Sequence, residues 1–133
     1  MDQQAQFEKA VDGLMKQGFI QSMDTMGESC AYGHFGGMLR CAVGHLLGDL
    51  KIPRRLQDSG INSLLEDQYM GDLVMAHLEI DDTAGDKQFL DKLQLAHDEG
   101  HTPKQMITKL VGFANVHNLV IPSPLLTLHN SND

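Results

Sequence analysis

The fold is decided most clearly by one stretch, GHTPKQMITKLVGFANVHN, residues 100–118. Thr102, Pro103 and Gln105 offer an N-cap hydroxyl, a proline at the first helical position and a capping-box side chain, which together predict the start of a helix. The side chains that we expect to be buried then recur at three- and four-residue spacing, as in an amphipathic helix. These are Met106, Ile107, Leu110, Phe113, Ala114 and His117. The stretch therefore predicts a helix that packs this face into a core.

The end of this helix is marked as well. Asn118 is a candidate left-handed C-cap, and Pro122 and Pro124 prevent the helix from continuing. We expect one helical domain over residues 1–128 and a frayed tail over 129–133.

A second amphipathic helix is predicted near the N-terminus, over residues 5–17. Its apolar residues also recur at helical spacing, and Gly18 follows where a helix would end. Phe19 and Ile20 are placed to fold back on the last turn, as often happens after a glycine C-cap.

Further helices are predicted between these two. A buried helix over about 40–50 ends before Pro53, and residues 59–80 form either one broken helix or two short ones, with Gly71 as the weak point. Another helix is closed by Gly100. The apolar residues of the stretch 59–80 are Ile61, Leu64, Leu65, Met70, Leu73, Val74 and Leu78. One face of the helix that Gly100 closes is defined by Phe89, Leu90, Leu93, Ala96 and His97.

Length and composition agree with a single helical domain. The chain has 133 residues, of which 41% are hydrophobic and 21% charged, enough to bury one core without disulfides. Aromatic residues make up only 5% while methionine occurs eight times, so aliphatic and thioether side chains fill the interior. We therefore expect a mainly α, single compact domain of about five helices, with a short β-hairpin or ordered glycine-rich loop near residues 30–41.

The net charge of the chain limits the kinds of molecule that it is expected to bind. A formal net charge of −8 repels a phosphate backbone, so general nucleic-acid binding is disfavoured. The N-terminus carries no basic or apolar leader, and no apolar run approaches the ~20 residues of a membrane span. We expect a cytoplasmic protein that does not enter membranes, with its two cysteines as thiols.

Four residues have the types and the order of a zinc site: Cys30, His34, Cys41 and His45. A hairpin could bring the first pair toward a helix that bears the second pair one turn apart. The spacing is not that of a zinc knuckle, however, and buried free cysteine is common. The alternative is that Cys41 is a small core residue and His45 a partly exposed helix side chain, with no cofactor bound.

The same region is a candidate ligand site. Three glycines at 33, 36 and 37 lead toward a helix start, where backbone amides could receive an anionic group. Charge and stacking surface would come from Tyr32, His34, Phe35 and Arg40. The alternative is a glycine-rich loop that only makes a tight connection.

An enzymatic hypothesis rests on His97-Asp98. Paired His-Asp residues on helices occur in metal-dependent phosphohydrolases, and His45 or His77 could supply the upstream ligand. No Asp follows until Asp133, so the metal would lack its downstream ligand. The alternative is a half-buried helix histidine beside a solvated aspartate. No nucleophile elbow, Walker loop or dinucleotide fingerprint is present in the sequence.

Several short motifs resemble a family of small proteins encoded by tailed phages and bacterial prophages. They are Ser29-Cys30-Ala31-Tyr32, Cys41-Ala42-Val43-Gly44-His45-Leu46-Leu47, Leu93-Gln94-Leu95-Ala96-His97-Asp98 and His117-Asn118-Leu119. The chain departs from the family where Leu47-Gly48-Asp49-Leu50 precedes Ile52-Pro53. The resemblance implies a phage setting and no established activity.

Small acidic phage proteins often bind and disable a host component. Our first hypothesis is therefore a non-enzymatic accessory protein that inhibits a host defence protein in the host cytoplasm through an acidic surface, with methionines that adapt to the partner. The competing explanation is that the acidic charge only keeps the chain soluble and methionine only fills the core. The second hypothesis is a binding protein, or sponge, for a small anionic ligand or signalling nucleotide at the loop 30–41. A homo-oligomer is a further partner that the sequence allows.

Overall fold

The described part of the chain is helical. The computed structural model describes residues 2–20, 41–48, 50, 52–53, 56, 61–80 and 84–131, and these residues contain helices but no strand. In chain order the helices are α1 (Gln3–Lys16), α2 (Ala42–Leu47), α3 (Ile61–Glu66), α4 (Met70–Leu78), α5 (Ala84–Asp98), α6 (Pro103–Val116) and α7 (Ser123–Asn130). The prediction of a mainly α single domain is confirmed. The predicted hairpin or loop lies outside the described residues, apart from Cys41.

The caps of α6 are those that the sequence predicts. The Gln105 backbone N–H donates to Thr102 Oγ1 at 3.1 Å, and Pro103 takes the first helical position. At the other end Asn118 has a positive φ of 56°, and the Leu119 N–H donates to the Ala114 carbonyl at 2.9 Å. These local bonds satisfy backbone groups that a helix terminus leaves unpaired.

α1 also begins and ends at local capping signals. The Ala5 N–H donates to Asp2 Oδ1 at 2.7 Å, so the helix starts two residues earlier than predicted. At its end Phe19 N–H donates to the Leu14 carbonyl at 2.8 Å, and the Phe19 side chain is buried. The expected fold-back is confirmed for Phe19 and is wrong for Ile20, which is exposed.

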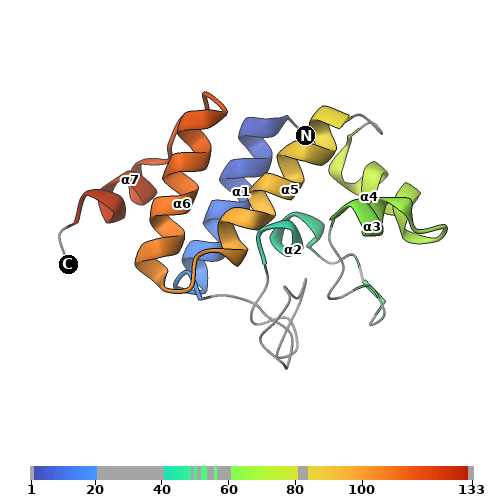
Figure 1. The fold of residues 1–133 in the computed structure, drawn as a ribbon, viewed down its shortest axis with the longest axis horizontal. Helices are drawn as coiled ribbons and strands as arrows, with labels where there is room; N and C mark the ends of the chain where they lie inside the picture. The colour runs from blue at the N-terminus through green and yellow to red at the C-terminus, as the bar shows by residue number, and fades with distance from the viewer. Residues whose placement is uncertain are drawn as a thin grey trace.

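Three long helices, α1, α5 and α6, lie side by side and build the core (Figure 1). The Phe113 ring of α6 stacks on Phe7 of α1, with ring centroids 5.7 Å apart, and packs against Phe89 of α5 at 5.1 Å. α2 packs against α1 and α5. α3 and α4 lie at one end of the molecule and α7 at the other.

The remaining helices differ from the predictions in ways that have local causes. Residues 59–80 contain two short helices, and the break precedes Gly71 instead of falling on it. α2 has only six residues, because Gly48 adopts a positive φ of 57° and ends it early. α7 was not predicted, and it includes the first two residues of the expected tail. Pro124 lies in its first turn, where proline is compatible with a helix, and Leu125 anchors it in the core. No helix in these ranges is both long and apolar enough for a membrane span.

Candidate functional site

Two of the four predicted zinc ligands can be placed. Cys41 is a fully buried core residue at the N-cap of α2. His45 Nε2 lies 2.8 Å from Gln17 Oε1, and its ring packs directly over Gly13. Both positions match the alternative of a core cysteine and a partly exposed histidine. Cys30 and His34 lie outside the described residues, so the zinc site stays a prediction. Among the residues that are described, no three His, Cys, Asp or Glu side chains are grouped to hold a metal.

The predicted anion site also lies mostly outside the described residues, which exclude Tyr32, His34, Phe35 and Arg40. Its one testable part is the amide at the start of α2. The Val43 N–H donates to the Gln94 side-chain oxygen at 3.0 Å in the interior. This amide therefore joins α2 to α5, and the predicted anion site itself stays a prediction.

His97 belongs to the same internal network. The ring is fully buried, not half-buried as expected, and its Nδ1–H donates to Asp98 Oδ1 at 2.9 Å. Gln94 Nε2 donates to the same carboxylate oxygen at 2.9 Å. Both contacts lie within α5 and fix Gln94, whose side-chain oxygen accepts from the α2 amide. The His77 side chain that was a candidate partner for His97 is exposed on α4.

A tight turn between α3 and α4 determines how Tyr69 is exposed at the start of α4. Asp67 Oδ2 accepts from the backbone N–H groups of Tyr69 and Met70 at 3.0 and 2.9 Å. A Cβ on Gly71 would lie 2.2 Å from the Leu65 carbonyl oxygen, so only glycine fits this close approach. The turn leaves Tyr69 76% exposed at the start of α4.

The outward side of α4 combines apolar side chains with negative charge. Tyr69 and Leu73, one turn apart, are 76% and 54% exposed. The residues of this surface, which we call the acidic face, are Glu66, Asp67, Tyr69, Asp72, Leu73 and Ala76. The sequence from 56 to 86 contains eight of the eighteen acidic residues and no lysine or arginine. α3 and α4, whose residues and connecting turn form the acidic face, lie at the end of the molecule opposite α7 (Figure 1).

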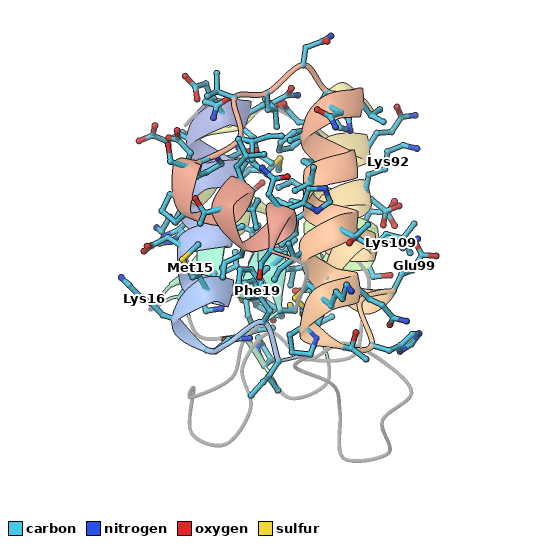
Figure 2. All side chains as sticks on the ribbon, turned by 90° about the vertical axis from the view of Figure 1, so that its left-hand side faces the viewer. Met15, Lys16, Phe19, Lys92, Glu99 and Lys109 are labelled. Atoms are coloured by element: carbon cyan, nitrogen blue, oxygen red, sulfur yellow. The ribbon has the colours of Figure 1, made fainter. Side chains whose placement is uncertain are left out.

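A second exposed surface, which we call the α5–α6 face, is a shallow hollow of about 340 Å³ between these helices. Lys92, Glu99 and Lys109 project from the same edge of the helix pair (Figure 2). Leu95 is 49% and Val116 76% exposed. The residues of the α5–α6 face are Lys92, Leu95, Ala96, Glu99, Thr108, Lys109, Gly112, Phe113, Val116 and His117.

His117 closes one end of this face. Its ring packs on Phe113 at a centroid distance of 4.4 Å and meets Phe89 edge-on at 5.3 Å. Burial and the nearby Lys92 ammonium both hold the pKa of His117 below its ordinary value. The ring is therefore neutral at pH 7, and Lys92 supplies the positive charge at this end.

Other hollows occur at helix contacts. One of about 610 Å³ lies between the start of α6 and α7, and one of about 310 Å³ lies between α1 and α2. In the α1–α2 hollow, Lys16 Nζ is 2.9 Å from Asp12 Oδ2, and His45 is bonded to Gln17. Four of its polar side chains are thus paired with one another, and we assign no site to this hollow.

Comparisons with protein-family models, with curated proteins and with solved structures find no match to this chain. The exposed surfaces described above are therefore the basis on which a function is proposed.

Sequence reasoning missed the acidic face. It listed Leu73 and Val74 together among the apolar residues of the helical stretch, because periodicity alone does not say which of two adjacent residues points inward. Val74 is buried and Leu73 is exposed. The signal that was present is the long stretch without a basic residue around an aromatic and a leucine at i, i+4 spacing.

Proposed function

We propose that this protein is a non-enzymatic binding protein that holds a positively charged segment of a partner protein on its acidic face. The proposal rests on the pair Tyr69 and Leu73, which are exposed one turn apart. In the part of the chain that the structure describes, the charged side chains of this surface are the carboxylates of Glu66, Asp67 and Asp72. Tyrosine is enriched among the residues that dominate binding energy at interfaces. Carboxylates around such anchors match a partner that carries lysine or arginine.

The apolar pair and the surrounding carboxylates have different physical roles in binding. Burial of the exposed parts of Tyr69 and Leu73 would contribute about 1 to 2 kcal/mol each, because apolar surface leaves water. The carboxylates would speed association with a basic partner and would act less at high salt. Single exposed apolar residues are common on protein surfaces. Two adjacent ones surrounded by carboxylates favour a docking surface for a partner.

The resemblance to phage-encoded proteins supports a host protein as the partner. In that setting, occupation of a basic surface on a host defence protein would block whatever that surface normally binds. The competing explanation is that acidic charge only maintains solubility, and it gives Tyr69 and Leu73 no role in binding. The two explanations therefore differ in what substitution of these side chains should do.

The test uses a photo-crosslinking residue at position 76, on the acidic face beside the two anchors, and a second one at the exposed position 120 as control. A host protein joined from position 76 alone is purified, and its affinity is measured for the wild type, the Tyr69→Ala/Leu73→Ala variant and Val120→Ala. We expect at least about a tenfold loss for the double variant, as is typical of hot-spot residues, and little change for Val120→Ala. Equal affinity of all three proteins would refute the proposal.

A further inference from the structure

The α5–α6 face has a charge order that differs from that of the acidic face. Three residues of α5 are spaced i, i+3 and i+4: Lys92, Leu95 and Ala96. Glu99, at i+7, directly follows the last residue of α5, and its N–H donates to the Leu95 carbonyl at 2.9 Å, so all four residues share one side. Lys92 and Glu99 are seven residues apart, or ~10 Å along the helix axis. Opposite charges thus bracket an apolar centre in which Leu95 is half exposed.

This order of positive, apolar and negative residues is complementary to the same order on a second helix that runs in the opposite direction. In an interface with twofold symmetry, each residue contacts a counterpart on the other subunit and the same contact occurs twice. If two α5 helices pack antiparallel with the axis near Leu95 and Ala96, Lys92 of each copy faces Glu99 of the other. We propose that two copies of this chain associate through the α5–α6 face in this antiparallel arrangement.

α6 supplies the rest of the apolar contact. Val116 is 76% exposed, and a Cβ on Gly112 would meet no atom within 4 Å, so the surface there is open to close approach. Lys109 Nζ lies 4.0 Å from Glu99 Oε1 in the same copy. Glu99 would therefore lie between its own Lys109 and Lys92 of the second copy.

Net charge favours this face over others for contact between identical chains. Two copies at −8 repel each other, yet two lysines against one glutamate leave the α5–α6 face one charge positive. The two copies can thus meet without placing acidic surfaces together. The helices present only ~20 Å of length, so the interface falls in the small, transient size class and the dimer dissociates readily.

The test is sedimentation of the full chain from about 10 µM to about 1 mM at low salt, where weak association becomes visible. We expect reversible dimerisation for the wild type. Lys92→Glu and Glu99→Lys should each weaken it about tenfold, because both symmetric pairs become repulsive. An equimolar mixture of these two variants, and the Lys92→Glu/Glu99→Lys double variant, should recover it. Lys16→Glu, an identical charge change on α1, should have no effect.

Three results would overturn the proposal: a monomer throughout the concentration range, failure of both the mixture and the double variant to recover association, or an equal loss with Lys16→Glu. All substituted positions are exposed, and retained helicity by circular dichroism confirms that each variant folds. None of these positions belongs to the acidic face, so the outcome is independent of the proposed function.

Discussion

The contact between α1 and α2 makes a sharp prediction about Gly13. This residue lies inside α1, where alanine normally stabilises a helix by about 0.5 to 1 kcal/mol. A Cβ at this position would lie 2.2 Å from His45 Nδ1 and 2.3 Å from Cγ of the same ring. The ring would have to move, which breaks its bond to Gln17, at about 1 kcal/mol, and strains the packing by about 1 to 3 kcal/mol. We expect Gly13→Ala to destabilise the protein by about 1 to 3 kcal/mol net.

The matched control is Gly112→Ala, inside α6, where a Cβ meets nothing within 4 Å. It should stabilise the protein by about 0.5 to 1 kcal/mol. The free energy of unfolding is measured by urea denaturation at low protein concentration. In a His45→Ala background, Gly13→Ala should become stabilising, since the obstructing ring is gone. Equal stabilisation by Gly13→Ala and Gly112→Ala in the wild-type background would refute this account of the α1–α2 contact.

Three further predictions concern stability. Gln94→Ala should cost about 2 kcal/mol, because it leaves a buried α2 amide without its acceptor, whereas Gln88→Ala at an exposed site of α5 should change the free energy of unfolding by less than about 0.5 kcal/mol. Urea denaturation checks both, and equal costs would contradict the internal cap. Leu125→Ala should cost about 2 to 4 kcal/mol and Leu126→Ala much less, because only the first is fully buried; matching melting temperatures would show that α7 is not docked. Finally, the lowered pKa of His117 means that the unfolded chain binds this proton more readily, so the free energy of unfolding should fall as the pH drops through about 6.5, the ordinary pKa of histidine. His117→Asn should flatten this dependence, and an unchanged slope would exclude His117 as its source.

The parts of the fold that sequence reasoning predicted are those with local signals. Thr102 and Asn118 cap α6 through bonds to residues a few positions away, and Gly18 and Phe19 end α1 in the same way. Such bonds depend only on nearby sequence, so residue type and spacing are sufficient to predict them.

The parts that sequence reasoning missed depend on distant contacts. α7 was overlooked because Pro124 was interpreted only as a residue that ends the preceding helix, whereas it lies in the first turn of a new one. The Gln94 cap of α2 joins residues 51 positions apart and has no local signature. Gly13 packs under the His45 ring of α2, and nothing in the local sequence indicates this contact.

The candidate site was missed for a related reason. Helical periodicity places Leu73 and Val74 on neighbouring sides of one helix, and only the packing of α4 against its neighbours decides that Val74 is buried. The charge pattern around Tyr69 was available in the sequence, but its meaning depends on the turn at Asp67 that leaves Tyr69 exposed. The charge of the chain therefore predicted that an acidic binding surface exists, but not where it lies.

The central claim, that the acidic face binds a basic partner, is tested most directly by nuclear magnetic resonance. The isotopically labelled protein is titrated with a helical peptide that carries a leucine stripe flanked by lysines, and with a matched peptide in which every lysine is glutamate. The account predicts that the lysine peptide alone shifts signals, that the shifts cluster at residues 66–76, and that Tyr69→Ala/Leu73→Ala removes them. Shifts located elsewhere, or equal shifts with both peptides, would contradict it.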